Sequence, residues 1–398
     1  MSDTKISSVE IQVSGMGVSG EILPEEQILR RDLEWEQRLA RTANLIRQIF
    51  RIQHVFIRLI GADGNWVRME SGTPVHQIRD GKNPCDTTLL SNETILITNA
   101  ETDPRILSHE ILNDVPDLKS YLAHSLQTSS GEAVGVLCAW DTKPREFSAD
   151  ELEMFNDVVY WVQREVIRAR ELDRASQVQR GLKPTAFIHL PGYEIAGFCR
   201  PTQSVGGDFY DWRATKHGAA FTVADVMGKG MGSAIIAATV RAVFRAAAYD
   251  HEADRVVQIA AEILEADLTE AGAFVTLIHG RLNVETNTVR YIDAGHGLTL
   301  HVSKQGDVTR LATTNFPLGI GFAEKWDIKS LVMYPGDTLL CLSDGMLDIF
   351  SGTLEALDEI SDVVLAGDTA KEVVSLLERV AQNADVNDDV TALVIRRT

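Results

Sequence analysis

The sequence has no long hydrophobic run. None of its 398 residues lie in an apolar stretch that approaches the roughly 20 residues needed to span a bilayer as a helix. The first ten residues, MSDTKISSVE, also lack the basic start and apolar core of a secretory signal. We therefore expect no membrane partner and a cytoplasmic location.

Basic residues are scarce as well. The chain has 38 Lys and Arg against 57 Asp and Glu, which gives a formal net charge of −19. Nucleic-acid surfaces need clustered Lys and Arg to contact phosphates, so we expect no nucleic-acid partner. The acidic excess fits cation binding or simple solubility.

Cysteine is rare and unpaired in sequence. The four cysteines (Cys85, Cys138, Cys199 and Cys341) form no CxxC motif, and three of them lie in apolar runs typical of strands. This pattern indicates buried free thiols. It provides no Cys or His cluster of the kind that binds zinc.

The length of the chain predicts more than one domain, because single domains usually hold roughly 100–200 residues. We expect an α+β protein with two domains. Residues 1–25 have no helical periodicity and are predicted to be a disordered tail. Residues 26–168 form the first domain, 185–398 the second, and 150–184 a connecting helix that overlaps the end of the first.

The first domain combines helix and strand patterns. Apolar residues recur every three or four positions over 25–50, which predicts an amphipathic helix. Strand-like runs follow in HVFIRLI and NWVRME around Asp63-Gly64, in ETILITNA, and in EAVGVLCAWD. These elements predict one α/β domain.

The connecting helix has a clear start signal. Ser148 and Glu151 have the spacing of a capping box, and Pro184 ends the pattern. Apolar residues from Leu152 to Ala169 follow a heptad rhythm that then shifts. Two interpretations remain open: a helix pair between the subunits of a homodimer, or a single helix packed on its own domains.

Aspartates mark the ends of strand-like runs in the second domain, in VGGDFYDW, FTVADVMGKGMG, LLCLSDGMLD and DVNDDVTALVI. The runs 208–214 and 219–225 flank a four-residue turn, and a symmetric hairpin places Asp208 opposite Asp225 at roughly 5 Å. Two carboxylates so close repel each other unless a cation lies between them. Oxygen ligands of this kind suit Mg²⁺ or Mn²⁺ rather than zinc.

Three further aspartates are placed to join this pair. Asp344 follows the apolar strand TLLCLS, and Asp388 and Asp389 immediately precede the strand VTALVI. Two metal ions held by such carboxylates lower the pKa of a bridging water and neutralise phosphoryl oxygens. The pattern therefore predicts phosphoester hydrolysis without a protein nucleophile.

A glycine-rich loop and one histidine lie near these motifs. Gly228 and Gly230 flank Lys229 just before a predicted helix at 232–249, so the loop either presents amides to a phosphate or serves as a flexible helix entry. The loop is not a nucleotide P-loop. His296, in DAGHG, is interpreted as structural. Further helices are predicted over 252–271 and 370–383.

Residues from about 177 to 398 resemble the SpoIIE family, the bacterial branch of the protein phosphatase 2C (PPM) fold. The resemblance is carried, in order, by QVQRGLKP, CRPTQSVGGDFYDW, VADVMGKGMGSA, DAGHG, FPLGIG, PGDTLLCLSDGMLD and NDDVTALVI. It implies an α-β-β-α sandwich with two Mn²⁺ or Mg²⁺ ions at one end. Asp208, Asp225, Asp344 and Asp388 would be catalytic metal ligands together with the carbonyl of Val226, and Asp389 competes with Asp388.

Residues from about 28 to 168 resemble a GAF domain, a sensor fold that binds small molecules. The carriers are NPCDTTLLSNETILITNAETDPR and TSSGEAVGVLCAWDTKPREFSADELEMF. The ligand is not predicted. Cys85 is interpreted as an ordinary buried cysteine, with a thiol sensor or chromophore attachment point as the alternative.

Together these resemblances imply a protein serine/threonine phosphatase that is regulated by its GAF domain. The implied substrate is a phosphorylated anti-sigma factor antagonist of the STAS type. Two alternatives are a scaffold that binds phosphoproteins without hydrolysing them and, because VGGDFYD resembles a GGDEF loop, a diguanylate cyclase.

Overall fold

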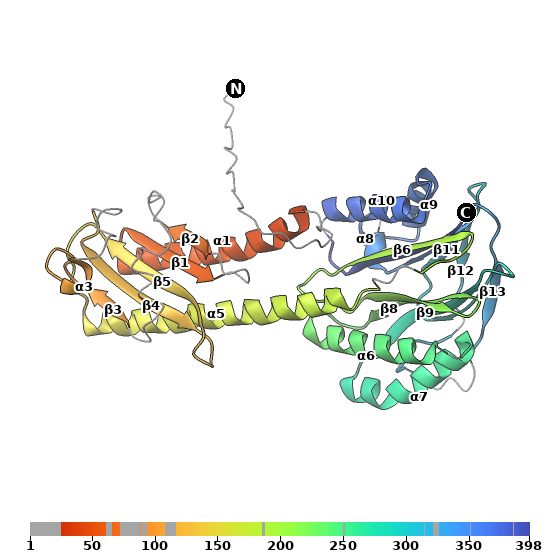
Figure 1. The fold of residues 1–398 in the computed structure, drawn as a ribbon, viewed down its shortest axis with the longest axis horizontal. Helices are drawn as coiled ribbons and strands as arrows, with labels where there is room; N and C mark the ends of the chain where they lie inside the picture. The colour runs from red at the N-terminus through yellow and green to blue at the C-terminus, as the bar shows by residue number, and fades with distance from the viewer. Residues whose placement is uncertain are drawn as a thin grey trace, which may run out of the picture. The chain divides into compact units, whose positions relative to one another are not determined.

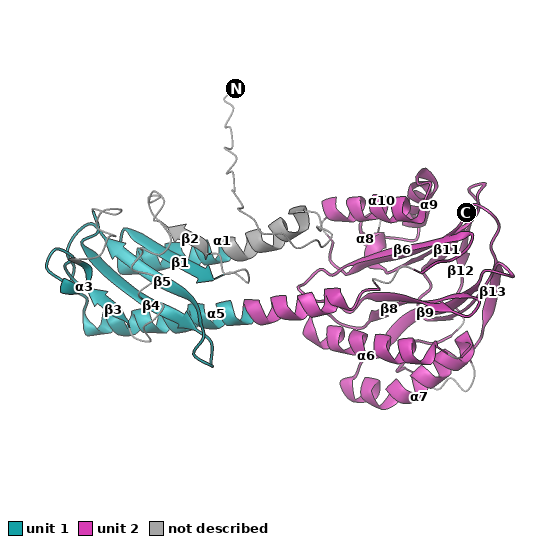
Figure 2. Ribbon diagram, viewed as in Figure 1, with its two compact units in different colours: residues 1–168 teal, residues 169–398 magenta. Residues whose placement is uncertain are grey.

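The computed structural model describes residues 25–60, 66–71, 88, 94–107, 117–184, 188–249, 251–313, 315–320, 326–350, 352–384 and 386–398 (Figure 1). The chain divides into two compact units, residues 1–168 and 169–398 (Figure 2). The predicted tail up to residue 24, the Asp63-Gly64 turn and Cys85 lie outside the described residues.

The first unit is built on one antiparallel sheet with the strand order β2-β1-β5-β4-β3. Its strands are β1 (His54–Ile60), β2 (Trp66–Ser71), β3 (Ile95–Ile97), β4 (Ser120–Gln127) and β5 (Ala133–Asp141). Helices α1 (Glu25–Phe50) and α5 (Ala149–Gly181) share a core with one face, and Leu39, Ile57 and Phe155 lie in it. The short helix α3 (Pro104–Leu107) contributes Ile106 to a core on the other face.

Helix α5 begins with the predicted capping box. The backbone amide of Ser148 donates to Oε2 of Glu151 at 2.9 Å, and the amide of Glu151 donates to Oγ of Ser148 at 3.2 Å. These bonds satisfy two amides that a helix start leaves without intrahelical partners. The helix ends at Gly181, three residues before Pro184. Pairing of this helix in a homodimer stays a prediction.

The second unit contains two five-stranded antiparallel sheets, ordered β13-β10-β9-β8-β7 and β12-β11-β14-β15-β6. Their strands are β6 (Tyr193–Arg200), β7 (Phe209–Thr215), β8 (Gly218–Val226), β9 (Val275–Asn283), β10 (Thr288–Ala294), β11 (Thr299–Val302), β12 (Val308–Leu311), β13 (Lys329–Val332), β14 (Thr338–Leu342) and β15 (Val390–Arg397). Side chains from both sheets, including Phe221, Ile278 and Leu393, form a shared core between them.

Helices cover the outer face of each sheet. Helices α6 (Met231–Ala247) and α7 (Ala253–Ala271) pack on the first sheet through Val240, Phe244 and Leu264. Helices α9 (Ala356–Ala366) and α10 (Ala370–Asn383) pack on the second, near the one-turn helix α8 (Gly345–Asp348). The second unit is thus the α-β-β-α sandwich that the family resemblance implied. The first unit is an α/β domain, as predicted.

The helices α1 and α10 have the predicted bounds, and α6 and α7 agree with the prediction to within two residues at each end. Helix α5 ends three residues before the predicted end of the connecting helix at 184. Strand β4 and the helices α3, α8 and α9 were not predicted. None of the helices in the described ranges has the length and apolar character of a transmembrane span. The described cysteines Cys138, Cys199 and Cys341 lie in strands β5, β6 and β14 as free thiols.

Candidate metal centre

The β7–β8 hairpin brings the first two aspartates together. Phe209 lies opposite Ala224 and Thr215 opposite Gly218, so the register places Asp208, one residue before β7, across from Asp225. Side chains alternate between the faces of a strand. Phe209, Ala224 and Val226 contribute to the core under α6 and α7. Asp208 and Asp225 therefore lie on the other side, toward the second sheet.

The second sheet contributes the remaining acids from two neighbouring strands. Asp344 follows β14, Asp388 and Asp389 precede β15, and these strands pair with Leu342 opposite Ala392. Ser343 ties the two strand ends together: its amide donates to the carbonyl of Thr391 at 2.9 Å and its hydroxyl to the carbonyl of Asp389 at 3.1 Å.

Gly345 allows the segment after Asp344 to pack closely against residues 388–389. A Cβ atom at position 345 would lie 2.2 Å from the carbonyl oxygen of Asp389 and 3.0 Å from that of Asp388. Only glycine allows the backbone after Asp344 to approach the other acidic segment so closely. The chain order Asp-Gly therefore has a packing reason at this position.

The aspartates perturb one another. Burial, followed by the charges of Asp225 and Asp389, raises the pKa of Asp208 well above its usual range. Burial and the charges of Asp344, Asp388 and Asp389 raise the pKa of Asp225 to about 6. Burial and the charge of Asp388 raise the pKa of Asp344. The contributing charges come from acids remote in the chain, so the segments that carry these acids converge on one place.

Asp389 has a different environment from the others. Its Oδ1 accepts hydrogen bonds from the amide of Thr202 at 2.7 Å and the hydroxyl of Thr202 at 3.0 Å. Its Oδ2 accepts one from the amide of Gly207 at 2.8 Å. The side chain is buried, so it anchors the loop 202–207 that leads into Asp208.

Asp388 is more open. Its side chain is 40% exposed and pairs with Lys229, whose Nζ lies 2.9 Å from Oδ2 of Asp388. Lys229 also donates to the carbonyl of Asn387. Oδ1 of Asp388 also accepts a hydrogen bond from the backbone amide of Asp389 at 2.9 Å. Both carboxylate oxygens of Asp389 accept hydrogen bonds from the loop 202–207, whereas Oδ2 of Asp388 is paired with the exposed Lys229, so we favour Asp388 as the metal ligand.

The residues fit a cation, although they do not already form a closed coordination sphere. Across the described residues, no group of three or more His, Cys, Asp or Glu side chains has an arrangement that could hold a metal ion without rearrangement. Oδ2 of Asp208 is buried without a hydrogen-bond partner. An orphaned carboxylate oxygen beside further carboxylates is costly unless a cation compensates it. The oxygen-only donor set suits Mg²⁺ or Mn²⁺.

The glycine loop enters helix α6 beside these acids. Gly228 and Gly230 have φ angles of 97° and 80°, a backbone region that favours glycine, and Met231 begins the helix. Their conformations support the helix-entry interpretation. The loop also positions Lys229, whose pKa is raised by its hydrogen bond to Asp388.

His296 is separate from this cluster. It is buried, and burial lowers its pKa, so the ring is neutral near pH 7. Its backbone amide donates to Asp293 at 2.8 Å in the tight turn after β10. Nε2 of its ring is buried without a hydrogen-bond partner, and the structural role of His296 stays a prediction.

Sequence reasoning did not identify Gln179 as a contact of the site. Near the end of α5, its Nε2 donates to the carbonyl of Gly206 at 2.7 Å, and the amide of Gly206 donates back to Oε1 at 3.1 Å. The same loop is held from its other side by Asp389. A lone glutamine in a helical pattern gives no signal for such a contact.

Two family models match the chain. The model for stage II sporulation protein E (SpoIIE) matches residues 215–398, and the GAF domain model matches residues 34–166. The two matches lie in the second and first compact units, respectively.

Curated relatives share about a quarter of the matched residues. Protein IcfG of Synechocystis sp. is 23% identical over 282 residues, which cover 61% of this chain and 44% of that protein. Phosphoserine phosphatase RsbU of Bacillus subtilis is 23% identical over 236 residues, which cover 57% of this chain and 70% of that protein. The chain thus spans less than half the length of IcfG.

Among solved structures, the chain is similar to the SiaA-PP2C domain of Pseudomonas aeruginosa. It is 19% identical with a TM-score of 0.49, and the match covers 59% of this chain and 98% of that one.

Proposed function

Because residues 215–398 form a SpoIIE-family domain and residues 34–166 a GAF domain, we propose that this chain is a metal-dependent protein serine/threonine phosphatase. The observation that carries the proposal is the convergence of Asp208, Asp225 and Asp344, whose pKa values are raised by burial and by neighbouring carboxylates, among them Asp388. A site that gathers several negative charges is suited to bind cations that in turn attract a phosphoryl group.

Asp208, Asp225, Asp344, Asp388 and the carbonyl of Val226 would hold two Mn²⁺ or Mg²⁺ ions. When bound, such a pair supplies a water of lowered pKa and neutralises phosphoryl oxygens. The chain's own residues prepare the site: Asp389 fixes the loop before Asp208, and Ser343 joins the segments that carry Asp344 and Asp388. Lys229, 43% exposed, places a positive charge at the edge, where it attracts a phosphoryl group.

Regulation by the GAF domain would act through helix α5. This helix continues from the first unit into the second, and its residue Gln179 holds both backbone groups of Gly206. The loop 202–207 is held by Gln179 on one side and by Asp389 on the other. A shift of the helix would move this loop and the adjoining Asp208. The ligand that the GAF domain would sense is unknown.

The substrate we propose is a phosphorylated anti-sigma factor antagonist with a STAS domain. The support is the SpoIIE-family match and the printed name of one relative, a phosphoserine phosphatase. We further propose that the protein acts as a homodimer in the cytoplasm. The heptad pattern of α5 motivates the homodimer. The absence of a membrane-spanning helix in the described residues is compatible with the cytoplasmic location.

The test measures phosphate release from a serine-phosphorylated STAS protein with Mn²⁺, with chelator, and with the Asp208→Asn variant. We expect release only from the parent protein with metal. Retained substrate binding without release by the parent protein would favour the scaffold, and a cyclic dinucleotide formed from GTP and Mg²⁺ would favour the cyclase. Either result would overturn the phosphatase proposal.

A further inference from the structure

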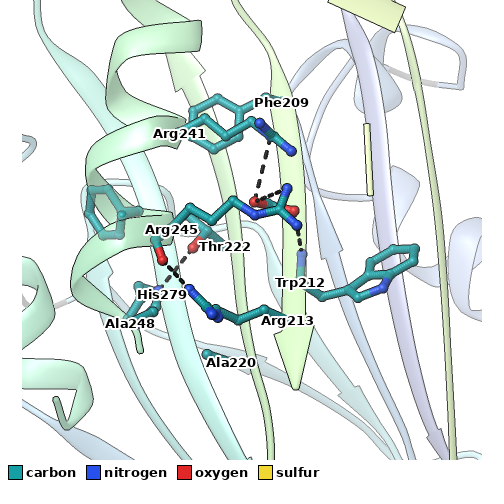
Figure 3. A pocket seen from close by; sticks show the side chains of 11 residues that line it. Phe209, Trp212, Arg213, Ala220, Thr222, Arg241, Arg245, Ala248 and His279 are labelled. Carbon is teal, nitrogen blue, oxygen red and sulfur yellow. Dashed lines mark hydrogen bonds and ion pairs between the residues drawn. The ribbon is translucent and has the colours of Figure 1, made fainter. Parts of the chain in front are cut away.

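A cluster of arginines lies between helix α6 and the first sheet of the second unit. Arg213 comes from β7, and Arg241 and Arg245 lie one turn apart on α6. Together with Asp211, Thr222 and His279 they line a small cavity (Figure 3). The cavity has a volume of about 10 Å³, room for about one water-sized group.

The charges around this cavity do not balance. Asp211 is the one acid among the lining residues, which include three arginines. Its Oδ2 lies 3.5 Å from Nε of Arg241 and 3.5 Å from Nη1 of Arg245, which is long for a hydrogen bond. Arginine remains charged in proteins, so the cluster has two positive charges in excess.

Two buried guanidinium donors and one buried ring nitrogen in the cluster have no hydrogen-bond partner. They are Nε of Arg213 and Nε of Arg241, and Nε2 of His279 joins them as an unpartnered ring nitrogen. Arg241 is 8% exposed and His279 is 1% exposed. His279 is neutral near pH 7, because burial lowers its pKa to about 3. The Thr222 hydroxyl lies 2.9 Å from Nδ1 of His279. When this hydroxyl donates to Nδ1, the neutral ring carries its proton on Nε2, and Nε2 is a donor.

A site with unpartnered buried donors and an excess of positive charge favours the binding of an anion. Water could satisfy a donor, but it would leave the charge uncompensated. An oxyanion supplies both acceptor oxygens and negative charge, and guanidinium groups bind such oxygens with strong, charge-assisted hydrogen bonds. Arg245 forms the accessible edge, since its side chain is 41% exposed.

The cluster is distinct from the metal centre. Asp211 and Thr222 face each other across the β7–β8 pair, and both line the cavity on the side covered by α6. Asp208 and Asp225 lie on the opposite side of the same strands, as the alternation along each strand requires. The two sites are therefore back to back across one sheet.

We propose that this cavity is a binding site for a small tetrahedral oxyanion, such as inorganic sulfate or phosphate. One oxygen enters the cavity between Arg241 and His279, and the remaining oxygens lie at the edge beside Arg245. The site is independent of the phosphatase proposal, because it uses none of the proposed metal ligands.

The test measures the thermal unfolding of the full-length chain in chelator, so that metal-bound anions do not contribute. Sodium sulfate is titrated against sodium chloride at equal ionic strength. We expect a saturable rise of the melting temperature with sulfate. Arg245→Gln should weaken the apparent sulfate affinity by about tenfold or more, the usual effect of losing one charge-assisted hydrogen bond.

The matched control is Arg255→Gln on α7, where the arginine side chain is 57% exposed and lies 3.9 Å from Glu262. It should retain the parent response. A sulfate effect that is equal in Arg245→Gln, or one that rises without saturation as excluded salts cause, would overturn the proposal. If Arg245→Gln does not fold, crystals soaked with selenate decide: an anomalous peak at Arg241 and Arg245 supports the site, and none there refutes it.

Discussion

The carboxylate of Asp389 accepts a 2.8 Å hydrogen bond from the backbone amide of Gly207, a residue 182 positions earlier in the chain. The bond joins the start of β15 in one sheet to the approach to β7 in the other. It fixes the position of Asp208, which directly follows Gly207. An acidic residue next to the proposed ligands thus has a supporting role of its own.

This arrangement predicts different effects for two adjacent aspartates. Asp389→Ala leaves the buried amides of Thr202 and Gly207 without acceptors, which should lower the free energy of unfolding by about 1–3 kcal/mol for each amide. Asp388→Ala should leave stability nearly unchanged and abolish Mn²⁺-dependent phosphate release. Urea unfolding and phosphate-release assays measure the two effects, and an interchange of the two phenotypes would show the assignment to be wrong.

The metal-free protein should lose stability as the pH rises from about 4 to about 6. Asp225 has a folded pKa of about 6 against a usual 3.8, so within this interval the folded state binds more protons than the unfolded state. The loss should be on the order of 3 kcal/mol for Asp225 alone. Asp208 and Asp344 shift in the same direction.

Urea unfolding in chelator across this pH range measures the effect. The variant Asp225→Asn should show a shallower slope than the parent protein. A parent protein whose stability increased with pH over this range would contradict the proposed crowding of carboxylates.

Lys229 should compete with metal for Asp388. Removing its charge in Lys229→Gln frees Asp388 and should tighten Mn²⁺ binding by up to about fivefold, since an exposed ion pair is worth at most about 1 kcal/mol. Calorimetric titration measures the affinity. The control Lys216→Gln, in the turn at the far end of the β7–β8 hairpin, should bind Mn²⁺ like the parent. Weaker binding by Lys229→Gln would mean that the lysine helps to assemble the site.

Gln179 should matter more than its neighbour Gln177. Gln179→Ala removes both hydrogen bonds to Gly206 and should weaken Mn²⁺ binding by about tenfold, as loss of supporting contacts around metal sites commonly does. Gln177 hydrogen-bonds Asp173 on its own helix, so Gln177→Ala is the matched control. Equal Mn²⁺ affinities in both variants would argue against coupling through α5.

Gly345 should tolerate no side chain. Gly345→Ala places a Cβ atom 2.2 Å from the carbonyl oxygen of Asp389, so the segment 388–389 must shift. We expect a loss of about 1–3 kcal/mol in stability and a loss of phosphate release. Gly232→Ala on α6, where a Cβ atom meets nothing within 4 Å, should be close to neutral. Activity retained by Gly345→Ala would show that this close packing is not needed.

The parts of the site that the sequence predicted are those with local signals. The turn between two strand-like runs was enough to place Asp208 across from Asp225, and Ser148 with Glu151 marked the start of α5. The family resemblance brought Asp344 and Asp388 to the same site. Which of Asp388 and Asp389 is free to bind a metal depends on hydrogen bonds to Thr202 and Gly207, and no local pattern reports those.

Other features were missed because packing alone creates them. Arg241 and Arg245 look like a solvated helix face in the sequence, and only the seating of α6 on β7 brings them to Arg213 and Asp211. Strand β4, SYLAHSLQ, mixes polar and apolar residues without strict alternation. Ser120 and Ser125 of this strand are nevertheless buried, so the polarity of its residues does not predict which of them are buried.

The position of β15 has a consequence for synthesis. This strand lies between β14 and β6 in its sheet, and the residues just before it complete the acidic cluster. Until residues 386–397 have left the ribosome, β6 has no neighbour in its sheet, β14 has only β11, and the loop 202–207 lacks its hydrogen bonds to Asp389. We therefore expect a growing or prematurely terminated chain to be unable to assemble the proposed metal centre until translation has passed this strand.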